Sequence, residues 1–102
     1  MIGGDFLTDY FSHIVKRLTF DDISILSILS DSEATAKFKS LKKSDLSNDS
    51  GLTEANFRKA IYRLDAINFV ETVTGHKEHR YYITELGMKA ISESLFNENV
   101  LQ

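Results

Sequence analysis

The sequence predicts a mainly α fold with a small β-hairpin (α+β), and three observations support this. Apolar residues recur at helical spacing along most of the 102-residue chain, whereas a period of two occurs only between residues 69 and 83. Proline is absent, which favours helices joined by short connections. The length corresponds to one domain over residues 1–102, and 42% apolar residues suffice for a core without disulfides.

The first predicted helix covers residues 5–18 and has a broad apolar stripe. Its apolar residues repeat at spacings of three and four: Phe6, Leu7, Tyr10, Phe11, Ile14, Val15 and Leu18. Three aromatic rings lie within six residues, which is more than one end of a small domain needs. We therefore expect the N- and C-terminal helices to contribute to a homodimer, with Phe6, Tyr10 and Phe11 in its interface. The alternative is that this stripe closes the chain's own core.

A second helix is predicted from an N-cap at Thr19 to about Ser30. Asp21 and Asp22 fall in its first turn, where the helix dipole favours acids. The apolar residues expected to be buried along this helix are Ile23, Leu26, Ile28 and Leu29. Residues 31–40 are polar and predict a loop with room for one helical turn.

Within that loop we expect Phe38 to turn inward, between Lys37 and Lys39. A short third helix is predicted over residues 42–49, with Leu41 and Leu46 as its apolar anchors. It ends in a polar turn in which Gly51 is free to adopt positive φ.

The best-marked helix lies between Thr53 and Asn68. Thr53 is a natural N-cap, and Glu54 in the first turn complements the helix dipole. Asn68 tolerates the left-handed conformation that often ends a helix. The spacing i, i+3, i+4, i+7 places four residues on one buried face: Phe57, Ala60, Ile61 and Leu64.

The opposite face of this helix carries five hydrogen-bond donors, three of them cationic: Asn56, Arg58, Lys59, Tyr62 and Arg63. A helix supported by the core on one side and bearing such a face on the other fits a DNA groove. The same pattern, taken alone, is equally consistent with a solvated surface helix.

A β-hairpin is predicted directly after this helix, with strands over residues 69–74 and 80–83 and a polar tip over residues 75–79. Thr84 then caps a last helix that fades near Phe96. Two short helices joined by a glycine-bearing turn, followed by a hairpin, are typical of a winged helix-turn-helix, with the hairpin as the wing.

The charge distribution adds to this prediction, although the net charge of −3 by itself argues against nucleic acid. Residues 37–80 hold nine Lys or Arg and six Asp or Glu, a balance of +3. The rest of the chain holds three basic and nine acidic residues, a balance of −6. A basic centre between acidic ends is consistent with a DNA-facing middle.

Two motifs resemble the winged-helix superfamily of prokaryotic DNA-binding proteins, in its MarR-like and ArsR-like branches. Asn68-Phe69-Val70 matches the start of the first wing strand, a glycine, a hydrophobic residue and a valine in that family, with asparagine here in place of glycine. The run from Tyr81 to Gly87 matches its Y-x-[IL]-T-x-x-G segment. The likeness covers residues 43–91, about half of the chain.

Within that superfamily the chain is similar to the TubR family. The similarity lies in the small size, in Ile14-Val15-Lys16-Arg17-Leu18 followed by Asp21-Asp22, and in the Tyr82–Gly87 segment. The Ser- and Lys-rich stretch before the third helix departs from the family. The resemblance implies a dimer that binds repeated sites of double-stranded DNA at a plasmid centromere, links them to a tubulin-like GTPase filament and represses its own operon.

The residues expected to contact DNA are Lys42, Lys43, Thr53, Asn56, Arg58, Lys59, Tyr62, Arg63, Lys77 and Arg80. The lysines at 42 and 43 and the wing residues Lys77 and Arg80 would mostly contact phosphates. Two other functions fit the same pattern: an ordinary MarR- or ArsR-like repressor, and a winged helix used only for protein–protein interaction.

Other chemistry has little support in the sequence. The chain has no cysteine, no glycine-rich phosphate loop and no nucleophile elbow, so we expect neither an enzyme nor a cofactor. His76 and His79 lie three apart in the hairpin tip, but no nearby cluster completes a metal site. There is little sequence outside the DNA-binding core to build a small-molecule pocket. With no long apolar run and no signal peptide, the predicted location is the cytoplasm, away from the membrane.

Overall fold

The computed structural model describes residues 10–101, with side chains described for residues 10–94. Residues 10–16 are helical and belong to the first helix. The elements that follow are α2 (Phe20–Asp31), the 3₁₀ turn η1 (Lys37–Lys39), β1 (Leu41–Lys42), α3 (Lys43–Ser50), α4 (Glu54–Ala66), β2 (Val70–Val73), β3 (Arg80–Ile83) and α5 (Glu85–Leu101). The strands form an antiparallel sheet in the order β1-β3-β2.

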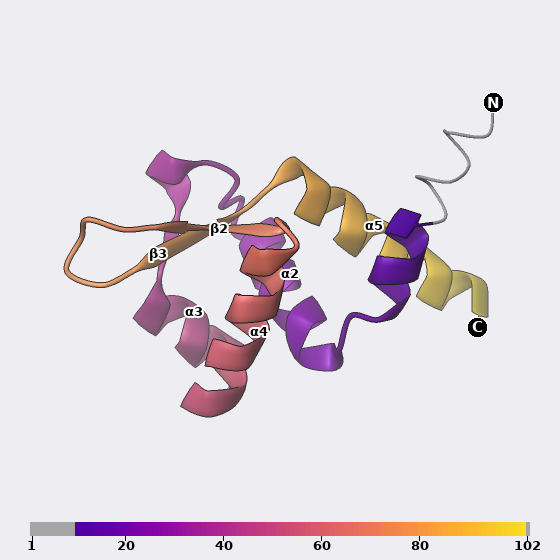
Figure 1. Cartoon of the computed structure of the whole chain (residues 1–102), viewed down its shortest axis with the longest axis horizontal. Helices are drawn as coiled ribbons and strands as arrows, with labels where there is room; N and C mark the ends of the chain where they lie inside the picture. The colour runs from indigo at the N-terminus through magenta and orange to yellow at the C-terminus, as the bar shows by residue number, and fades with distance from the viewer. Residues whose placement is uncertain (1–9, 102) are drawn as a thin grey trace.

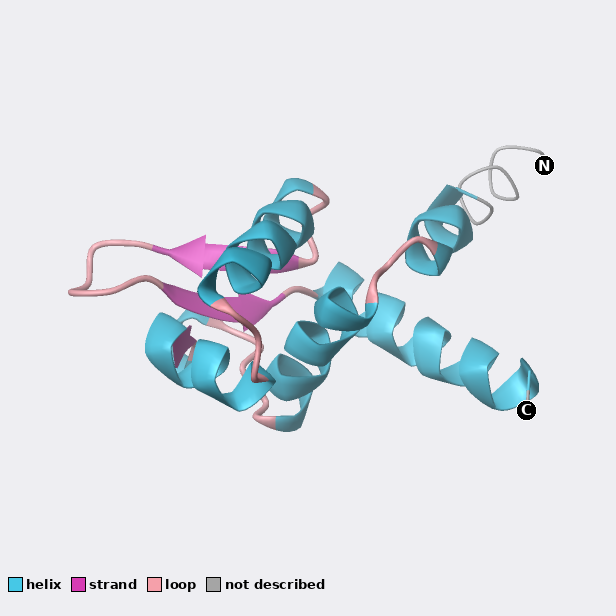
Figure 2. Ribbon diagram, turned by 90° about the horizontal axis from the view of Figure 1, so that it is seen from below, coloured by secondary structure: helices cyan, strands magenta, loops and turns pink. Residues whose placement is uncertain are grey.

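The elements are arranged as a winged helix. Helices α3 and α4 form the helix-turn-helix, and the β2–β3 hairpin forms the wing, which projects at one end of the molecule (Figure 1). Helix α4 packs against β2, while α3 packs beside β1 at the other edge of the sheet. The first helix and α5 lie together at the end opposite the wing (Figure 2), where the Ser12 hydroxyl donates to Glu93 at 2.8 Å. Helix α4 therefore lies beside the base of the wing.

The core lies between α2, α4 and the sheet. Its largest fully buried side chains are Phe57, Phe69, Ile25, Leu26, Leu29, Leu46, Leu64 and Ile83. The stripe predicted for α4 is confirmed, because all four of its residues are buried. Burying a side chain of this size contributes about 1.5–3 kcal/mol. This packing fixes the axis of α4 and leaves its other face exposed.

The local signals at the ends of α4 are confirmed. The Thr53 hydroxyl accepts a hydrogen bond from the Asn56 amide at 3.2 Å. Gly51 and Asn68 both adopt left-handed conformations, at φ 70° and 66°. Thr84 caps α5 by accepting from the Gly87 amide at 3.0 Å. A Cβ on Gly87 would collide with the backbone of Phe69, which explains why this position takes glycine.

Three expectations about individual segments were wrong. Leu41 belongs to a strand and pairs with Tyr81 of β3, so β-structure is not confined to residues 69–83. Phe38 does not turn inward, because it is 84% exposed on η1. Helix α5 does not fade near Phe96 but continues to Leu101.

The polar stretch between α2 and β1 is held against the sheet by its backbone. The carbonyl of Ala34, a buried residue, accepts a hydrogen bond from the Ile83 amide at 2.8 Å. The single turn that the sequence allowed there is η1. The first helix ends by Lys16, and the part of its predicted range before residue 10 lies outside the described residues.

Candidate nucleic-acid interface

The outer face of α4 presents the five predicted donors to solvent. Asn56, Arg58, Lys59, Tyr62 and Arg63 are all exposed, because they lie opposite the buried stripe. Arg58 donates to Glu54 one turn earlier, at 3.1 Å, and both side chains are largely exposed. Such a pair contributes only about 0.3–0.5 kcal/mol, so Arg58 can leave it at little cost.

Arg63 differs from the other donors because a buried carboxylate holds it. Its Nη2 donates to Oδ1 of Asp22 at 2.8 Å and to the Thr19 hydroxyl at 3.3 Å. Hydrogen bonding to Asp22 is the main cause that raises the pKa of Arg63. Asp22 also accepts from the Thr19 amide and so completes the capping box of α2. The pair joins the last turn of α4 to the first turn of α2.

The two predicted cations of the wing also differ. Lys77 lies at the exposed tip. Arg80 is partly buried in β3, and its Nε and Nη2 donate to the hydroxyl and the carbonyl of Ser40, at 3.0 and 2.6 Å. Ser40 is itself buried. Arg80 therefore ties the wing to the chain before β1, while Lys77 extends into solvent.

A carboxylate in the wing caps α3. Glu78 accepts from the amide and the hydroxyl of Ser44, at 2.9 and 3.2 Å. The hydrogen bond from the Ser44 amide is the main cause that lowers the pKa of Glu78. Helix α3 has no capping side chain of its own at Lys42, so the wing supplies one. This places exposed Lys42 and half-exposed Lys43 close to the wing.

A cleft of about 300 Å³ separates α4 from the wing. Its floor consists of the buried side chains of Phe57, Ile61 and Tyr81. Burial raises the pKa of Tyr81, and the charge of Asp65 adds to the effect. Tyr81 carries no sign of a binding role in the sequence, because alternation along the strand indicates only a buried ring.

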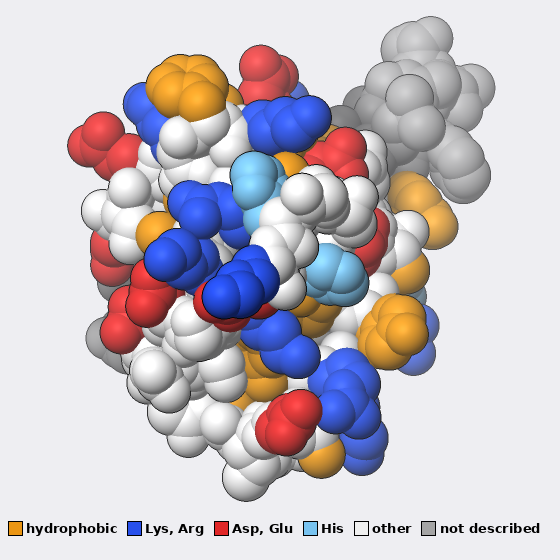
Figure 3. Space-filling model, turned by 90° about the vertical axis from the view of Figure 1, so that its left-hand side faces the viewer, with side chains coloured by type: hydrophobic (Ala, Val, Ile, Leu, Met, Phe, Trp, Pro, Cys, Tyr) orange, Lys and Arg blue, Asp and Glu red, His pale blue; other side chains and the backbone are white. Residues whose placement is uncertain are grey.

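Most of the predicted contacts thus lie around the wing-bearing end of the molecule, whereas Arg63 is joined to the first turn of α2. Lys, Arg and His side chains cluster around the centre of this end, and several Asp and Glu side chains lie nearer its margins (Figure 3). Within the described part of the chain, no group of three or more His, Cys, Asp or Glu side chains is placed to hold a metal ion. None of the helices in residues 10–101 is long and apolar enough to cross a membrane.

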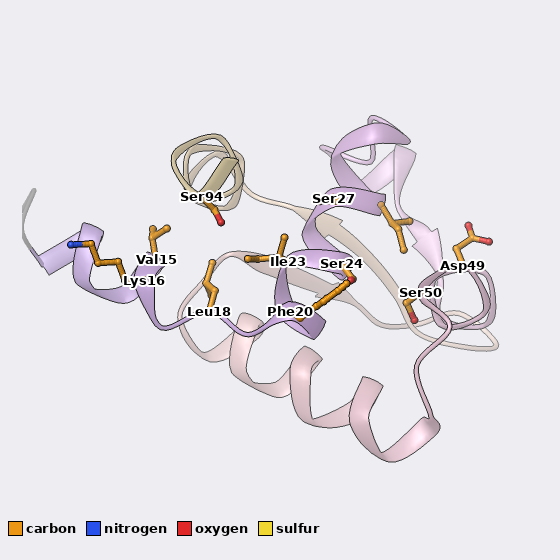
Figure 4. Close-up of a pocket in the computed structure, with 11 residues that line it drawn as sticks. Val15, Lys16, Leu18, Phe20, Ile23, Ser24, Ser27, Asp49, Ser50 and Ser94 are labelled. Carbon is orange, nitrogen blue, oxygen red and sulfur yellow. The ribbon is translucent and has the colours of Figure 1, made fainter. Parts of the chain in front are cut away.

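Two of the three predicted dimerisation residues, Tyr10 and Phe11, lie at the other end. Tyr10 is 61% exposed, whereas Phe11 packs against Phe69 of the same chain, with ring centroids 6.0 Å apart. Phe6 lies outside the described residues. An open groove of about 770 Å³ borders this helix (Figure 4). Its apolar lining comes from the first helix, the connection at Leu18 and α2, while Ser94 of α5 and Asp49 and Ser50 of α3 complete its sides.

Comparison with known proteins identifies the family. No family model matches the chain. The DNA-binding protein TubR of Priestia megaterium is 44% identical over 89 residues, which cover 87% of this chain and 88% of that protein. The chain belongs to the TubR family. The solved structure of TubR from Bacillus megaterium pBM400 superposes with a TM-score of 0.82 at 45% identity, over 85% of this chain and 97% of that one.

More distant structures share the winged-helix fold with this TubR-family chain. The DNA-binding TubR fragment from Clostridium botulinum has a TM-score of 0.59 at 23% identity, over 71% of this chain and 90% of the fragment. A MarR-family regulator from Silicibacter pomeroyi has a TM-score of 0.65 at 18% identity, over 92% of this chain and 64% of its own. The expected resemblance to the winged-helix superfamily and, within it, to the TubR family is confirmed by these structures together with the 44% identical relative.

Proposed function

We propose that this protein is a sequence-specific, dimeric DNA-binding protein of plasmid partition. It binds repeated centromere sites, links them to a tubulin-like GTPase filament and represses its own operon. The observation that carries the proposal is the 44% identity, along most of both chains, to a protein named as DNA-binding. The exposed donor face of α4, backed by a fixed core, supports it independently.

We assign different roles to the side chains around the interface. Asn56, Arg58, Lys59 and Tyr62 contact base edges and nearby phosphates from α4, and Thr53 adds a contact at its N-terminus. Lys42, Lys43 and Lys77 contact phosphates, which position the protein but do not specify sequence. Arg63 and Arg80 are engaged by Asp22 and Ser40, so we assign them mainly to positioning α4 and the wing.

The dimer is proposed to form at the end away from the wing. The exposed Tyr10 and the apolar groove beside the first helix support a second copy there. Analytical ultracentrifugation at micromolar concentration tests this. We expect a dimer for the wild type and a shift toward monomer for Tyr10→Ser. A wild-type monomer at tens of micromolar would contradict the dimer.

DNA binding is tested by fluorescence anisotropy with DNA from upstream of the gene and with a random duplex. We expect tighter binding to the upstream DNA. No binding to any duplex would contradict the proposal and favour a winged helix used for protein–protein interaction alone.

The partner is tested by cosedimentation of the DNA complex with filaments of a tubulin-like GTPase encoded nearby. DNA binding without cosedimentation would favour an ordinary repressor. All of these activities place the protein in the cytoplasm.

A further inference from the structure

The first turn of α4 carries a carboxylate that the fold uses little. Residues 53–56 are all exposed, and Figure 1 shows this turn at the lower edge of the molecule. Glu54 is the first residue of the helix, but Thr53 already provides the cap by accepting from the Asn56 amide. Glu54 instead accepts from Nη2 of Arg58 through its Oε2, at 3.1 Å. The helix dipole is the remaining structural use of its charge.

The other acid of α4, Asp65, shows what a structural carboxylate looks like in this helix. Asp65 accepts from the Thr72 hydroxyl at 2.9 Å and so joins the end of α4 to β2. The contact of Glu54 is with its own helix alone, and the side chains of Glu54 and Arg58 are 71% and 60% exposed. The Glu54–Arg58 pair is therefore presented to whatever α4 binds.

An acid on a DNA-facing helix is repelled by the phosphates, so it favours binding only where it accepts from a base. In a helix-turn-helix, the N-terminal residues of the second helix contact base edges in the major groove. Glu54 and Arg58 lie at this end of α4, one turn apart. Arginine donates to O6 and N7 of guanine, and a carboxylate accepts from the N4 amino group of cytosine.

The major-groove edge of a single G·C pair presents these atoms side by side. Its two acceptors on guanine are followed by the donor on cytosine, which matches a guanidinium next to a carboxylate. An A·T pair instead presents a donor between two acceptors, together with a methyl group. The Glu54–Arg58 pair is therefore complementary to G·C and not to A·T.

We propose that Glu54 and Arg58 together read one G·C pair, with Arg58 donating to guanine and Glu54 accepting from cytosine. The inference rests on the proposed DNA binding and adds Glu54 to it as a specificity-determining residue. The guanidinium has further N–H groups beyond the one that Glu54 accepts, and Oε1 of Glu54 accepts no hydrogen bond from the described residues. Because the pair already holds the two groups together, less side-chain freedom is lost on binding.

The chain offers a matched control for the helix dipole. Glu85 begins α5 as Glu54 begins α4, since each is exposed and follows a capping threonine. Glu54→Ala and Glu85→Ala therefore remove the same kind of interaction with a helix end, but only Glu54→Ala removes an acid from the proposed interface. Circular dichroism of both variants checks that they are folded.

The measurement is fluorescence anisotropy with the bound upstream site, in which each G·C pair is replaced in turn by A·T. At the pair that is read, we expect the wild type to lose affinity by about five- to 150-fold. Glu54→Ala and Arg58→Ala should both lose most of this discrimination, at the same pair, while Glu85→Ala retains it. On a random-sequence duplex, Glu54→Ala should bind at least as tightly as the wild type, because a charge that repels phosphates is gone.

The other outcomes overturn the proposal in different ways. If Glu54→Ala binds every duplex more weakly by the same factor, Glu54 serves only the helix. Wild-type discrimination at every pair in Glu54→Ala would overturn the reading of cytosine and leave DNA binding intact. Loss of discrimination at different pairs in Glu54→Ala and Arg58→Ala would overturn the shared pair. A wild type that binds no duplex would overturn the proposed function as well.

Discussion

Two pairs of cations on α4 and the wing differ in what holds them. Lys59 and Lys77, the unpaired lysines, are exposed and make no ion pair or side-chain hydrogen bond within the described residues. Arg63 and Arg80, the anchored arginines, donate to Asp22 and to Ser40. The sequence does not distinguish the four, because all are basic residues of the predicted recognition helix and wing.

The difference lies in the partners, which come from distant parts of the chain. Asp22 is 41 residues from Arg63, and Ser40 is 40 residues from Arg80. Both partners are buried. An arginine bound to a buried group fixes the element that carries it, whereas a solvated lysine can move to a phosphate. We therefore propose that the anchored arginines position α4 and the wing, and that the unpaired lysines are the cations that contact DNA.

The largest effect is expected for the ion pair between Arg63 and Asp22. Asp22→Ala removes two charge-assisted hydrogen bonds and half of a capping box, and should lower the free energy of unfolding by about 2–3 kcal/mol. The cost stays below that of a fully buried pair because the Arg63 side chain is 46% exposed and can be hydrated. Arg63→Ala should be similarly costly, because it leaves the Asp22 carboxylate buried without its cation.

Urea unfolding of both single variants and the double variant measures this pair. The double variant should lose much less than the sum of the two single losses. Arg58→Ala is the matched control, since its exposed pair with Glu54 should contribute only about 0.3–0.5 kcal/mol. If Arg63→Ala changes stability as little as Arg58→Ala does, the distinction between anchored and unanchored cations is wrong.

The next effect concerns DNA affinity. Arg58→Ala and Lys59→Ala should weaken DNA binding without unfolding the protein, because both residues lie opposite the buried stripe of α4. If either contacts a base, affinity for the cognate site should fall by about 1–3 kcal/mol, with a smaller loss on random DNA. Anisotropy titrations with both duplexes provide the measurement. Equal losses would mean phosphate contact only, and unchanged affinity would rule out α4 as the recognition helix.

The sequence predicted the parts of this molecule that depend on nearby residues. The cap at Thr53, the buried stripe from Phe57 to Leu64 and the left-handed Asn68 all follow from neighbours within a few positions. The strands of the wing and the cap at Thr84 also follow from residues that are close together in the sequence. These signals were enough for the fold and for the exposed face of α4.

The features that the sequence did not reveal depend on pairs that only the folded chain brings together. Strand β1 is two residues long, so alternation could not mark it, and it exists because it pairs with β3. The cap that Glu78 places on Ser44 joins residues 34 positions apart. The outward Phe38 reflects the path of η1, which a count of apolar residues does not determine.

A smaller effect is expected at the wing, in the salt dependence of DNA binding. Lys77→Ala should flatten the slope of log affinity against log salt by about 0.9 per protomer, if the lysine neutralises one phosphate. Arg80→Ala should leave the slope nearly unchanged and lower stability instead, because its guanidinium already donates to Ser40. Anisotropy across a salt series for both single variants and the double variant decides this. A double variant that flattens the slope by about two units would place both residues on phosphates.

The smallest effect is expected for the carboxylate beside Lys77. Glu78 has a pKa below its ordinary value of 4.5, chiefly because the Ser44 amide donates to it. A depressed pKa in the folded state stabilises the protein above the ordinary pKa, and this contribution disappears as the pH falls through the folded value. Glu78→Ala should therefore unfold at a lower temperature than the wild type near neutral pH, and the difference should shrink below about pH 4.

Thermal unfolding from about pH 7 to about pH 2 measures this contribution against Glu71→Ala, which removes an exposed carboxylate from the same hairpin. The control should show no comparable loss at neutral pH, because the structure gives Glu71 no hydrogen bond to a helix end. A difference for Glu78→Ala that persists unchanged in acid would mean that packing, and not the charged cap, joins the wing to α3. The tip carrying Lys77 would then be positioned by the sheet alone, and the hydrogen bonds from Ser44 to Glu78 would have no part in holding it.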